Sequence, residues 1–243
     1  SFDGRTALIT GASMGVGAAT ARAFAARGAN LVLIARGEDR LRALEAELDL
    51  GDRVHVAPMD VTDLDAFAAL LAETETRFGT VDVLVNNAGY HARGPVESAD
   101  AADLGRMIDV NLKAPVMATR LALPYLRRAT RPAVINVASL AGRTPVPGSA
   151  TYSATKFGLR AFGLALYEEL RGQDDNHRIK IASVSPGPID TGFIMDDIDQ
   201  VTDLTFSQPI VTAEQVAEAI VELVDNATLD KPMPRISGYL TTI

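Results

Sequence analysis

A tyrosine and a lysine four residues apart, Tyr152 and Lys156, are the side chains in this chain best suited to chemistry. On a helix, positions i and i+4 share one face, so the phenol and the ammonium can point into the same pocket. A free phenol has a pKa of about 10, and a nearby positive charge favours the phenolate. The pair can therefore act as a general acid or base near neutral pH. Ser139, thirteen residues upstream, can hydrogen-bond the same oxygen or hold a substrate carbonyl.

Near the start of the chain, an apolar segment from Arg5 to Thr10 runs into a glycine-rich turn and then an alanine-rich helix that ends near Gly28. The turn reads Gly11-Ala12-Ser13-Met14-Gly15-Val16-Gly17. In a strand–turn–helix unit, glycines let the backbone approach a pyrophosphate, whose charge lies at the helix N-terminus. The Gly-x-x-x-Gly-x-Gly spacing differs from the most familiar dinucleotide fingerprint. A purely structural turn would explain these glycines alone equally well, but the downstream Ser, Tyr and Lys favour a nucleotide site.

Two more polar features fit the same pocket. The apolar strand predicted from Val81 to Val85 ends in Asn86-Asn87-Ala88-Gly89, which either binds a ligand at the strand's carboxyl end or forms an ordinary turn. Asn111 interrupts the apolar stretch from Leu104 to Leu126. Because a buried amide needs partners, Asn111 either satisfies a helix irregularity or holds a water beside the lysine.

The elements that must position these residues alternate between strands and helices without a linker. Apolar strands separated by helices indicate one parallel sheet covered on both faces. Further strands are predicted at Asn30 to Ala35, Arg53 to Ala57, Pro132 to Val137, Ile179 to Val184 and, more briefly, Arg235 to Leu240. Further helices are predicted at Gly37 to Leu48, Asp63 to Phe78, Leu104 to Arg128, Tyr152 to Arg171 and Ala213 to Asp225.

Composition excludes several classes of function. The chain has 243 residues, a net charge of −8, no cysteine and no tryptophan. It therefore has no disulfide, thiol catalyst or cysteine-bound metal, and its acidic balance disfavours nucleic acid. With three histidines and no metal-ligand cluster, no metal site is expected. No apolar run is long enough to span a membrane and no secretory signal is visible, so we expect a cytoplasmic protein.

With these motifs in this order, the chain resembles the short-chain dehydrogenase/reductase family, in its shorter single-domain branch. The resemblance implies a Rossmann-like α/β fold, a doubly wound parallel sheet of about seven strands with helices on both faces, as one NAD(P)-binding domain over residues 1–243. It also implies a catalytic tetrad of Asn111, Ser139, Tyr152 and Lys156. In this tetrad Tyr152 exchanges the proton and Ser139 orients the substrate oxygen. Lys156 lowers the Tyr152 pKa and grips the nicotinamide ribose, and Asn111 anchors a proton relay.

By the same resemblance, the cofactor contacts the glycine turn, the ends of four strands and two members of the tetrad. The residues implied are Gly11, Ser13, Met14, Gly15, Val16, Gly17, Arg36, Asp60, Val61, Asn87, Ala88, Gly89, Tyr152, Lys156, Pro186, Gly187, Ile189 and Thr191.

Cofactor preference depends on the end of the second strand. NAD enzymes place an acid there, whereas this chain has Ala35-Arg36, and an arginine can grip a 2′-phosphate. We therefore predict NADP(H), with NAD(H) possible. Glu38 and Asp39 are near enough to bind a ribose, but the first turn of the next helix suits them better. Met14 stands where many NADP-preferring relatives carry a second base.

Around the substrate, the resemblance implies a lid over residues 188–209, which mixes apolar and acidic residues. The lid either closes on an uncharged, hydrophobic carbonyl compound or is an ordinary amphipathic helix. Tyr90, His91 and Arg93 follow the Asn-Asn-Ala-Gly turn and can edge the pocket, although a lone loop histidine such as His91 is more often solvated.

We expect an NADPH-dependent enzyme that interconverts a carbonyl compound and its alcohol, with Tyr152 as the acid or base. The alternatives are an NAD-dependent alcohol dehydrogenase and a non-catalytic nucleotide-bound sensor or scaffold. Helices 104–128 and 152–171 are apolar nearly all round and must be buried on every side. The resemblance implies that they form the subunit interface, so we also expect a homodimer or homotetramer.

Overall fold

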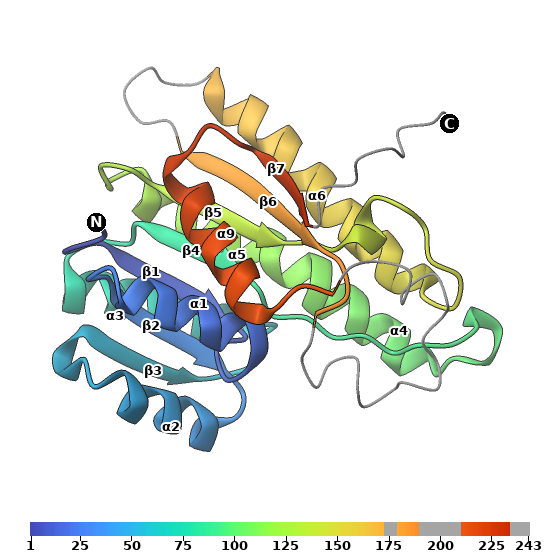
Figure 1. The fold of residues 1–243 in the computed structure, drawn as a ribbon, viewed down its shortest axis with the longest axis horizontal. Coiled ribbons are helices and arrows are strands. Elements are labelled where there is room, and N and C mark those ends of the chain that lie inside the picture. The colour runs from blue at the N-terminus through green and yellow to red at the C-terminus, as the bar shows by residue number, and fades with distance from the viewer. Residues whose placement is uncertain (173–178, 190–209, 234–243) are drawn as a thin grey trace.

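The computed structural model describes residues 1–172, 179–189 and 210–233. At the centre of the described part lies a seven-stranded sheet in the order β3-β2-β1-β4-β5-β6-β7, in which every pair of neighbours is parallel (Figure 1). Its strands are β1 (Thr6–Thr10), β2 (Asn30–Ala35), β3 (Val54–Pro58), β4 (Val83–Asn86), β5 (Ala133–Val137), β6 (Lys180–Pro186) and β7 (Asp230–Met233). The doubly wound α/β fold predicted from the sequence is confirmed.

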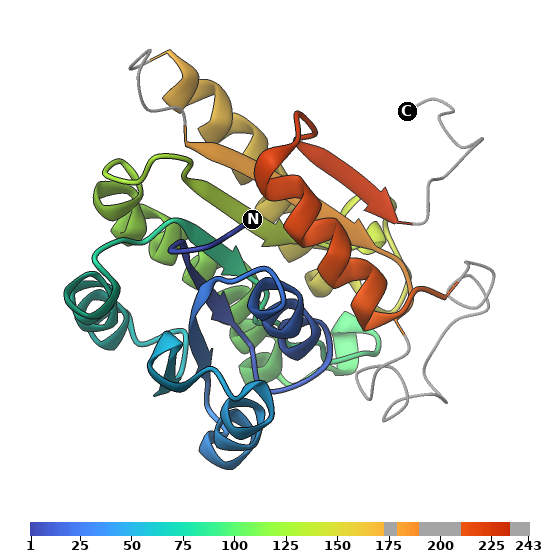
Figure 2. The same ribbon diagram turned by 60° about the vertical axis from the view of Figure 1, so that its left-hand side comes forward.

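Helices cover both faces of this sheet (Figures 1 and 2). One face carries α1 (Gly15–Ala25), α2 (Glu38–Leu48) and α9 (Ala213–Asp225). The other carries α3 (Leu64–Phe78), α5 (Ala114–Leu126) and α6 (Ala150–Arg171). The shorter α4 (Ala101–Ile108) precedes α5.

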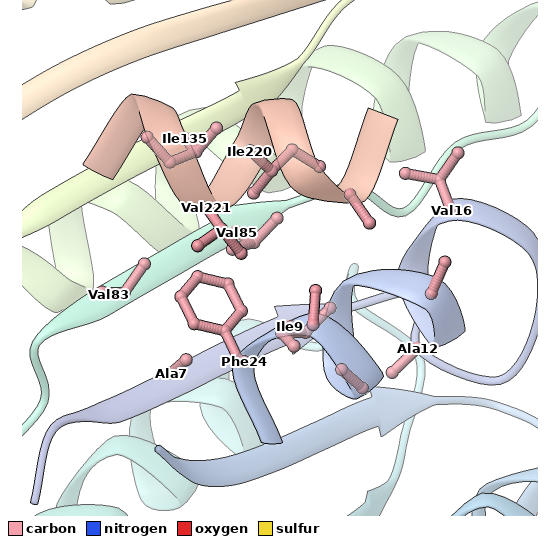
Figure 3. Packing of buried hydrophobic residues seen from close by; sticks show 14 of the residues in the cluster. Ala7, Ile9, Ala12, Val16, Phe24, Val83, Val85, Ile135, Ile220 and Val221 are labelled. Carbon is pink, nitrogen blue, oxygen red and sulfur yellow. The ribbon is translucent and has the colours of Figure 1, made fainter. Parts of the chain in front are cut away.

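Side chains alternate between these two layers along each strand, as the pleat of a strand requires. In β1, Ile9 packs under α1 and α9, whereas Leu8 packs against the α3 and α5 side. Figure 3 shows the first layer, where Phe24 of α1 lies beside Val85 of β4 and Val221 of α9. Phe24 is fully buried, which removes its ring from water and stabilises the fold by about 2–3 kcal/mol. This packing fixes α1, and with it the glycine turn, against the sheet.

Two predicted helix boundaries need correction, and one predicted strand is not tested. The seventh strand is Asp230–Met233, whereas the predicted strand 235–240 lies outside the described residues. Pro232 argues against a strand in general, but β7 is the edge strand, where a proline is tolerated. The single helix predicted over 104–128 is instead α4, a π-helical turn at Asp109–Lys113, and α5. Helix α6 begins at Ala150, two residues before Tyr152.

Candidate active site

The strand order reverses between β1 and β4, and a cavity of about 990 Å³ opens at the carboxyl ends of the strands. Segments that follow β1, β4, β5 and β6 all line it, represented by Gly11, Asn87, Ser139 and Gly187. In open parallel sheets, ligands bind in the crevice at such a reversal.

The glycine turn presents the N-terminus of α1 to this cavity. Met14, at the N-cap, makes no side-chain hydrogen bond to the backbone of the first turn of α1, and that turn has no acidic residue. The free backbone N–H groups and the helix dipole therefore remain available for an anion. A Cβ on Gly17 would lie 2.1 Å from the Gly11 carbonyl oxygen, so the turn closes this tightly only with glycine at that position. The turn thus fits the pyrophosphate of a dinucleotide.

The Asn-Asn-Ala-Gly turn is bonded directly to the glycine turn. The Asn87 side chain donates to the carbonyl oxygens of Thr10, at 2.8 Å, and Gly11, at 3.2 Å. The Thr10 hydroxyl oxygen accepts from the backbone N–H groups of Asn87 and Ala88. These bonds hold the ends of β1 and β4 at one fixed separation, so Asn87 stabilises the part of the cavity wall that these two strand ends form.

Tyr152 and Lys156 come from the first turns of α6, and both line the cavity. Lys156 is buried, and its Nζ donates to the Val137 carbonyl oxygen at 2.9 Å. The same Nζ lies 5.7 Å from the centroid of the Tyr152 ring. Burial lowers the pKa of Lys156 from 10.5 to about 8, because the ammonium group has lost its water.

Burial raises the pKa of Tyr152 above 10, while the Ser139 hydroxyl and the positive charge of Arg93 oppose this change. The phenol is therefore protonated at neutral pH and able to donate a proton. The Ser139 hydroxyl also accepts from the backbone N–H of Ala141 at 3.1 Å, which orients it beside the phenol. That Lys156 lowers the Tyr152 pKa, as the resemblance implies, stays a prediction.

Asn111 lies in the π-helical turn and is buried behind the cavity wall. Its amide makes a reciprocal pair with the backbone of Tyr90, donating to the Tyr90 carbonyl and accepting from the Tyr90 N–H, each at 2.7 Å. Its Oδ1 and the Lys156 Nζ would lie 3.6 and 3.7 Å from a Cβ on Gly89. The Asn111 amide therefore ties the π-helical turn to the loop after β4, and the two roles left open for it from the sequence stay predictions.

Most of the predicted site residues therefore meet in one cavity. Those that line it are Gly11, Ser13, Met14, Gly15, Val16, Arg36, Asp60, Val61, Asn87, Ala88, Gly89, Ser139, Tyr152, Lys156, Pro186, Gly187 and Ile189. Gly17 and Asn111 lie behind the lining rather than in it. Thr191 and most of the predicted lid fall outside the described residues. On either side of residues 190–209 the described chain is joined, because the Val211 N–H donates to the Pro188 carbonyl at 3.0 Å.

The expectation that His91 is solvated was wrong, because the ring is largely buried. Its ring stacks on the Tyr152 ring, with centroids 4.0 Å apart and planes 19° from parallel, and its Nε2 lies 3.1 Å from the Ser149 hydroxyl. Burial, aided by the charges of Arg93 and Lys156, lowers the pKa of His91 to about 3, so the imidazole is neutral. Sequence reasoning missed Ser149, whose only signal is its place three residues before Tyr152.

Away from Tyr152, the cavity is lined by the segment that follows β2. Arg36 comes directly after this strand, and Glu38, Asp39 and Arg40 form the start of α2. Glu38 and Asp39 occupy the first turn of α2, as predicted. Arg40, in the first turn of α2, was missed by the sequence analysis. Its Nη1 lies 3.3 Å from the Met14 sulfur, so a second guanidinium stands beside the glycine turn.

Asp60 follows β3 in the same region. Burial raises its pKa, but hydrogen bonds from Thr62 and the charges of Arg106 and Arg36 outweigh burial and lower the pKa overall. Asp60 is therefore ionised at neutral pH.

Within residues 1–172, 179–189 and 210–233, no group of His, Cys, Asp and Glu side chains could hold a metal ion. No helix in that described part is long and apolar enough to cross a membrane.

Comparison with known proteins agrees with this geometry. The family model described as short chain dehydrogenase matches residues 5–202. Sulfoacetaldehyde reductase 2 of Chromohalobacter salexigens is 39% identical over 190 residues, which cover 77% of this chain and 74% of that protein.

Two solved structures share the whole fold. A glucose/ribitol dehydrogenase of the same family from Brucella melitensis superposes with a TM-score of 0.86 at 30% identity, covering 95% of each chain. A metagenomic short-chain oxidoreductase in complex with NADP superposes with a TM-score of 0.78 at 33% identity, covering 95% of this chain and 96% of that one. The chain belongs to the short-chain dehydrogenase/reductase family of NAD(P)-binding oxidoreductases.

Proposed function

We propose that this protein is an NADPH-dependent reductase that converts a ketone or aldehyde into an alcohol, or catalyses the reverse reaction. The observation that carries the proposal is the convergence of Ser139, Tyr152 and Lys156 with the uncapped N-terminus of α1 on one cavity. When bound, a nicotinamide cofactor supplies or accepts the hydride at the substrate carbon.

The chain's own residues handle the oxygen and its proton. Ser139 binds the substrate oxygen, and Tyr152, protonated at neutral pH, donates its phenolic proton as the alcohol forms. Lys156 holds the nicotinamide ribose, and its positive charge stabilises the phenolate that remains on Tyr152. The neutral ring of His91, stacked on Tyr152, keeps the phenol in one orientation and shields it from water.

The proposed preference for NADP(H) is supported by positive charge at the part of the cavity that follows β2, where the adenosine ribose would lie. Arg36 and Arg40 both line this region, and Arg40 contacts the Met14 side chain, at the place where relatives carry a second base. Together the two guanidinium groups offer bidentate partners for a 2′-phosphate. The Glu38 carboxylate accepts from Arg42 at 3.4 Å, so it is drawn along the helix surface.

Reduction kinetics with NADPH and NADH test the proposal. Charge-assisted hydrogen bonds are worth about 1.5–3 kcal/mol. Arg36→Ala should therefore raise the KM for NADPH roughly 10-fold to 100-fold and leave the KM for NADH nearly unchanged. Tyr152→Phe should bind NADPH normally and lose turnover. Unchanged NADPH kinetics in Arg36→Ala would remove the role given to Arg36 and favour an NAD-dependent dehydrogenase. Tight cofactor binding with no Tyr152-dependent turnover on a broad panel of carbonyl compounds would favour a sensor or scaffold.

We also propose that the enzyme assembles as a homodimer or homotetramer through α5 and α6. Several apolar side chains of these helices are only partly covered within the chain, including Val116, Met117, Phe157 and Leu164. A second copy would remove them from water.

A further inference from the structure

Arg93 is a charged residue in the cavity wall that the proposed reaction does not use. It is half-buried, and its Nε is buried without any hydrogen-bond acceptor. No carboxylate in the described part of the chain forms an ion pair with it. Other partly buried arginines have such a partner: Arg5 pairs with Asp225, and Arg160 with Asp230. Since an unsatisfied buried donor costs about 1–3 kcal/mol, Arg93 is arranged for a partner that the described residues do not supply.

The loop that carries Arg93 is tied down on both sides. His91 contacts the Ser149 hydroxyl, and the backbone N–H of Gly94 donates to the Gly148 carbonyl at 2.9 Å. Both partners immediately precede α6, which carries Tyr152. The backbone that carries Arg93 is thus fixed relative to Tyr152, and the guanidinium group lies near enough to the phenol to lower its pKa.

Charges in the described cavity lining are divided between its two ends. The acidic lining residues, Glu38, Asp39 and Asp60, all follow β2 and β3 at the cofactor end. Around Tyr152, the described lining carries only the positive charges of Lys156 and Arg93. The Lys156 ammonium group already donates to the Val137 carbonyl. The paired N–H groups of the Arg93 guanidinium therefore remain available for the substrate.

We propose that the substrate carries an oxyanion, a carboxylate or a sulfonate, and that Arg93 binds this group while Tyr152 and Ser139 hold the carbonyl. This inference rests on the proposed reductase activity. A guanidinium group suits a carboxylate or sulfonate because two of its N–H groups can donate in parallel. It replaces the expectation of an uncharged substrate that the composition of the lid suggested.

The test compares aldehydes of equal chain length with and without the charge. Succinic semialdehyde and 3-sulfopropanal carry the two candidate anions, and methyl 4-oxobutanoate and 3-(methylsulfonyl)propanal are their neutral counterparts. With NADPH, the wild-type protein should reduce at least one of the charged aldehydes with a kcat/KM roughly 10-fold or more above its neutral partner. The better anion then distinguishes a carboxylate from a sulfonate.

Arg93→Gln should lower kcat/KM for the preferred anion roughly 10-fold to 100-fold, mainly through KM, and change the neutral aldehydes by less than about threefold. Arg93→Lys should lower this kcat/KM less than Arg93→Gln does, because lysine keeps the positive charge but lacks the two parallel N–H donors of a guanidinium group. Any effect that acts through the pKa of Tyr152 is common to both aldehydes of a pair and cancels in their ratio. Arg106→Gln is the matched control, since Arg106 also lines the cavity but lies 3.8 Å from the Asp60 carboxylate.

Equal losses on charged and neutral aldehydes in Arg93→Gln, or no preference for an anion in the wild type, would overturn the inference and leave the reductase proposal standing. Calorimetric titration of the NADPH-loaded protein with butanoate and propane-1-sulfonate decides the case without turnover. Binding of either anion that Arg93→Gln abolishes supports the site even if none of the aldehydes is reduced, in which case the reductase proposal alone is in question. No binding of either anion to the wild type overturns the site.

Discussion

Replacing Lys156 with methionine should stabilise the cofactor-free protein while abolishing its turnover. Burial lowers the Lys156 pKa from 10.5 to about 8, so the folded state holds this proton less tightly than the unfolded chain does. A pKa difference of about 2.5 corresponds to about 3 kcal/mol of unfolding free energy. Methionine gives up the 2.9 Å bond to the Val137 carbonyl, which costs about 1–2 kcal/mol. The net gain near pH 7 is about 1–2 kcal/mol, or a Tm increase of roughly 3–6 °C.

The sign of this gain depends on pH. Below about pH 8 the folded wild type must keep a buried ammonium group, so the penalty is fully present. Between about pH 8 and 10.5 the folded protein has released the proton while the unfolded chain still binds it, so wild-type stability rises with pH. Near pH 10.5 most of the penalty has disappeared, and Lys156→Met should no longer be the more stable protein.

Thermal and urea unfolding without cofactor, at one protein concentration, measure the effect at both pH values. Lys156→Arg is the control, because a guanidinium group stays charged throughout this range and should gain nothing from the rise in pH. A methionine variant that is less stable than the wild type by the same amount at pH 7 and pH 10.5 would refute the argument from desolvation.

Three further predictions follow from contacts elsewhere. Gly17→Ala should lose measurable NADPH binding in a fluorescence titration and lower the Tm, because its Cβ would lie 2.1 Å from the Gly11 oxygen; normal binding would contradict a tight pyrophosphate turn. Asp230→Asn should lower the unfolding free energy by about 2–3 kcal/mol in urea, since it leaves the partly buried Arg143 and Arg160 without their shared carboxylate. Sedimentation at micromolar concentration should give a dimer or larger, and a clean monomer would remove the proposed α5 and α6 interface.

Much of this fold could be predicted because its strands are continuous apolar runs with turn residues at their ends. Strand β2 occupies Asn30–Ala35 and α9 occupies Ala213–Asp225, both as predicted, since apolar periodicity and capping residues mark these limits locally. The Thr212 cap and Gln215 form a complete capping box at the start of α9. Such signals depend on the nearest few residues and therefore survive without knowledge of tertiary contacts.

Contacts between distant segments could not be predicted in this way. The stacking of His91 on Tyr152 joins residues sixty-one positions apart, and it depends on the Gly94–Gly148 bond that brings their loops together. No residue near His91 in the sequence predicts that hydrogen bond. The same holds for Arg40, whose contact with Met14 exists only because α2 begins beside the glycine turn.

The π-helical turn at Asp109–Lys113 shows why Asn111 could be singled out from the sequence although its geometry could not be predicted. Asn111 stood out because an amide within an apolar helix must be satisfied, and the structure satisfies it with the backbone of Tyr90. In a regular helix, the backbone repeat would fix where this side chain points. An extra residue in one turn re-aims it, and such bulges recur at functional sites. Asn111 therefore holds the Tyr90 backbone in place, and with it the start of the loop that leads to His91 and Arg93. The irregularity in the helix thus helps to position the loop on which the proposed choice of substrate depends.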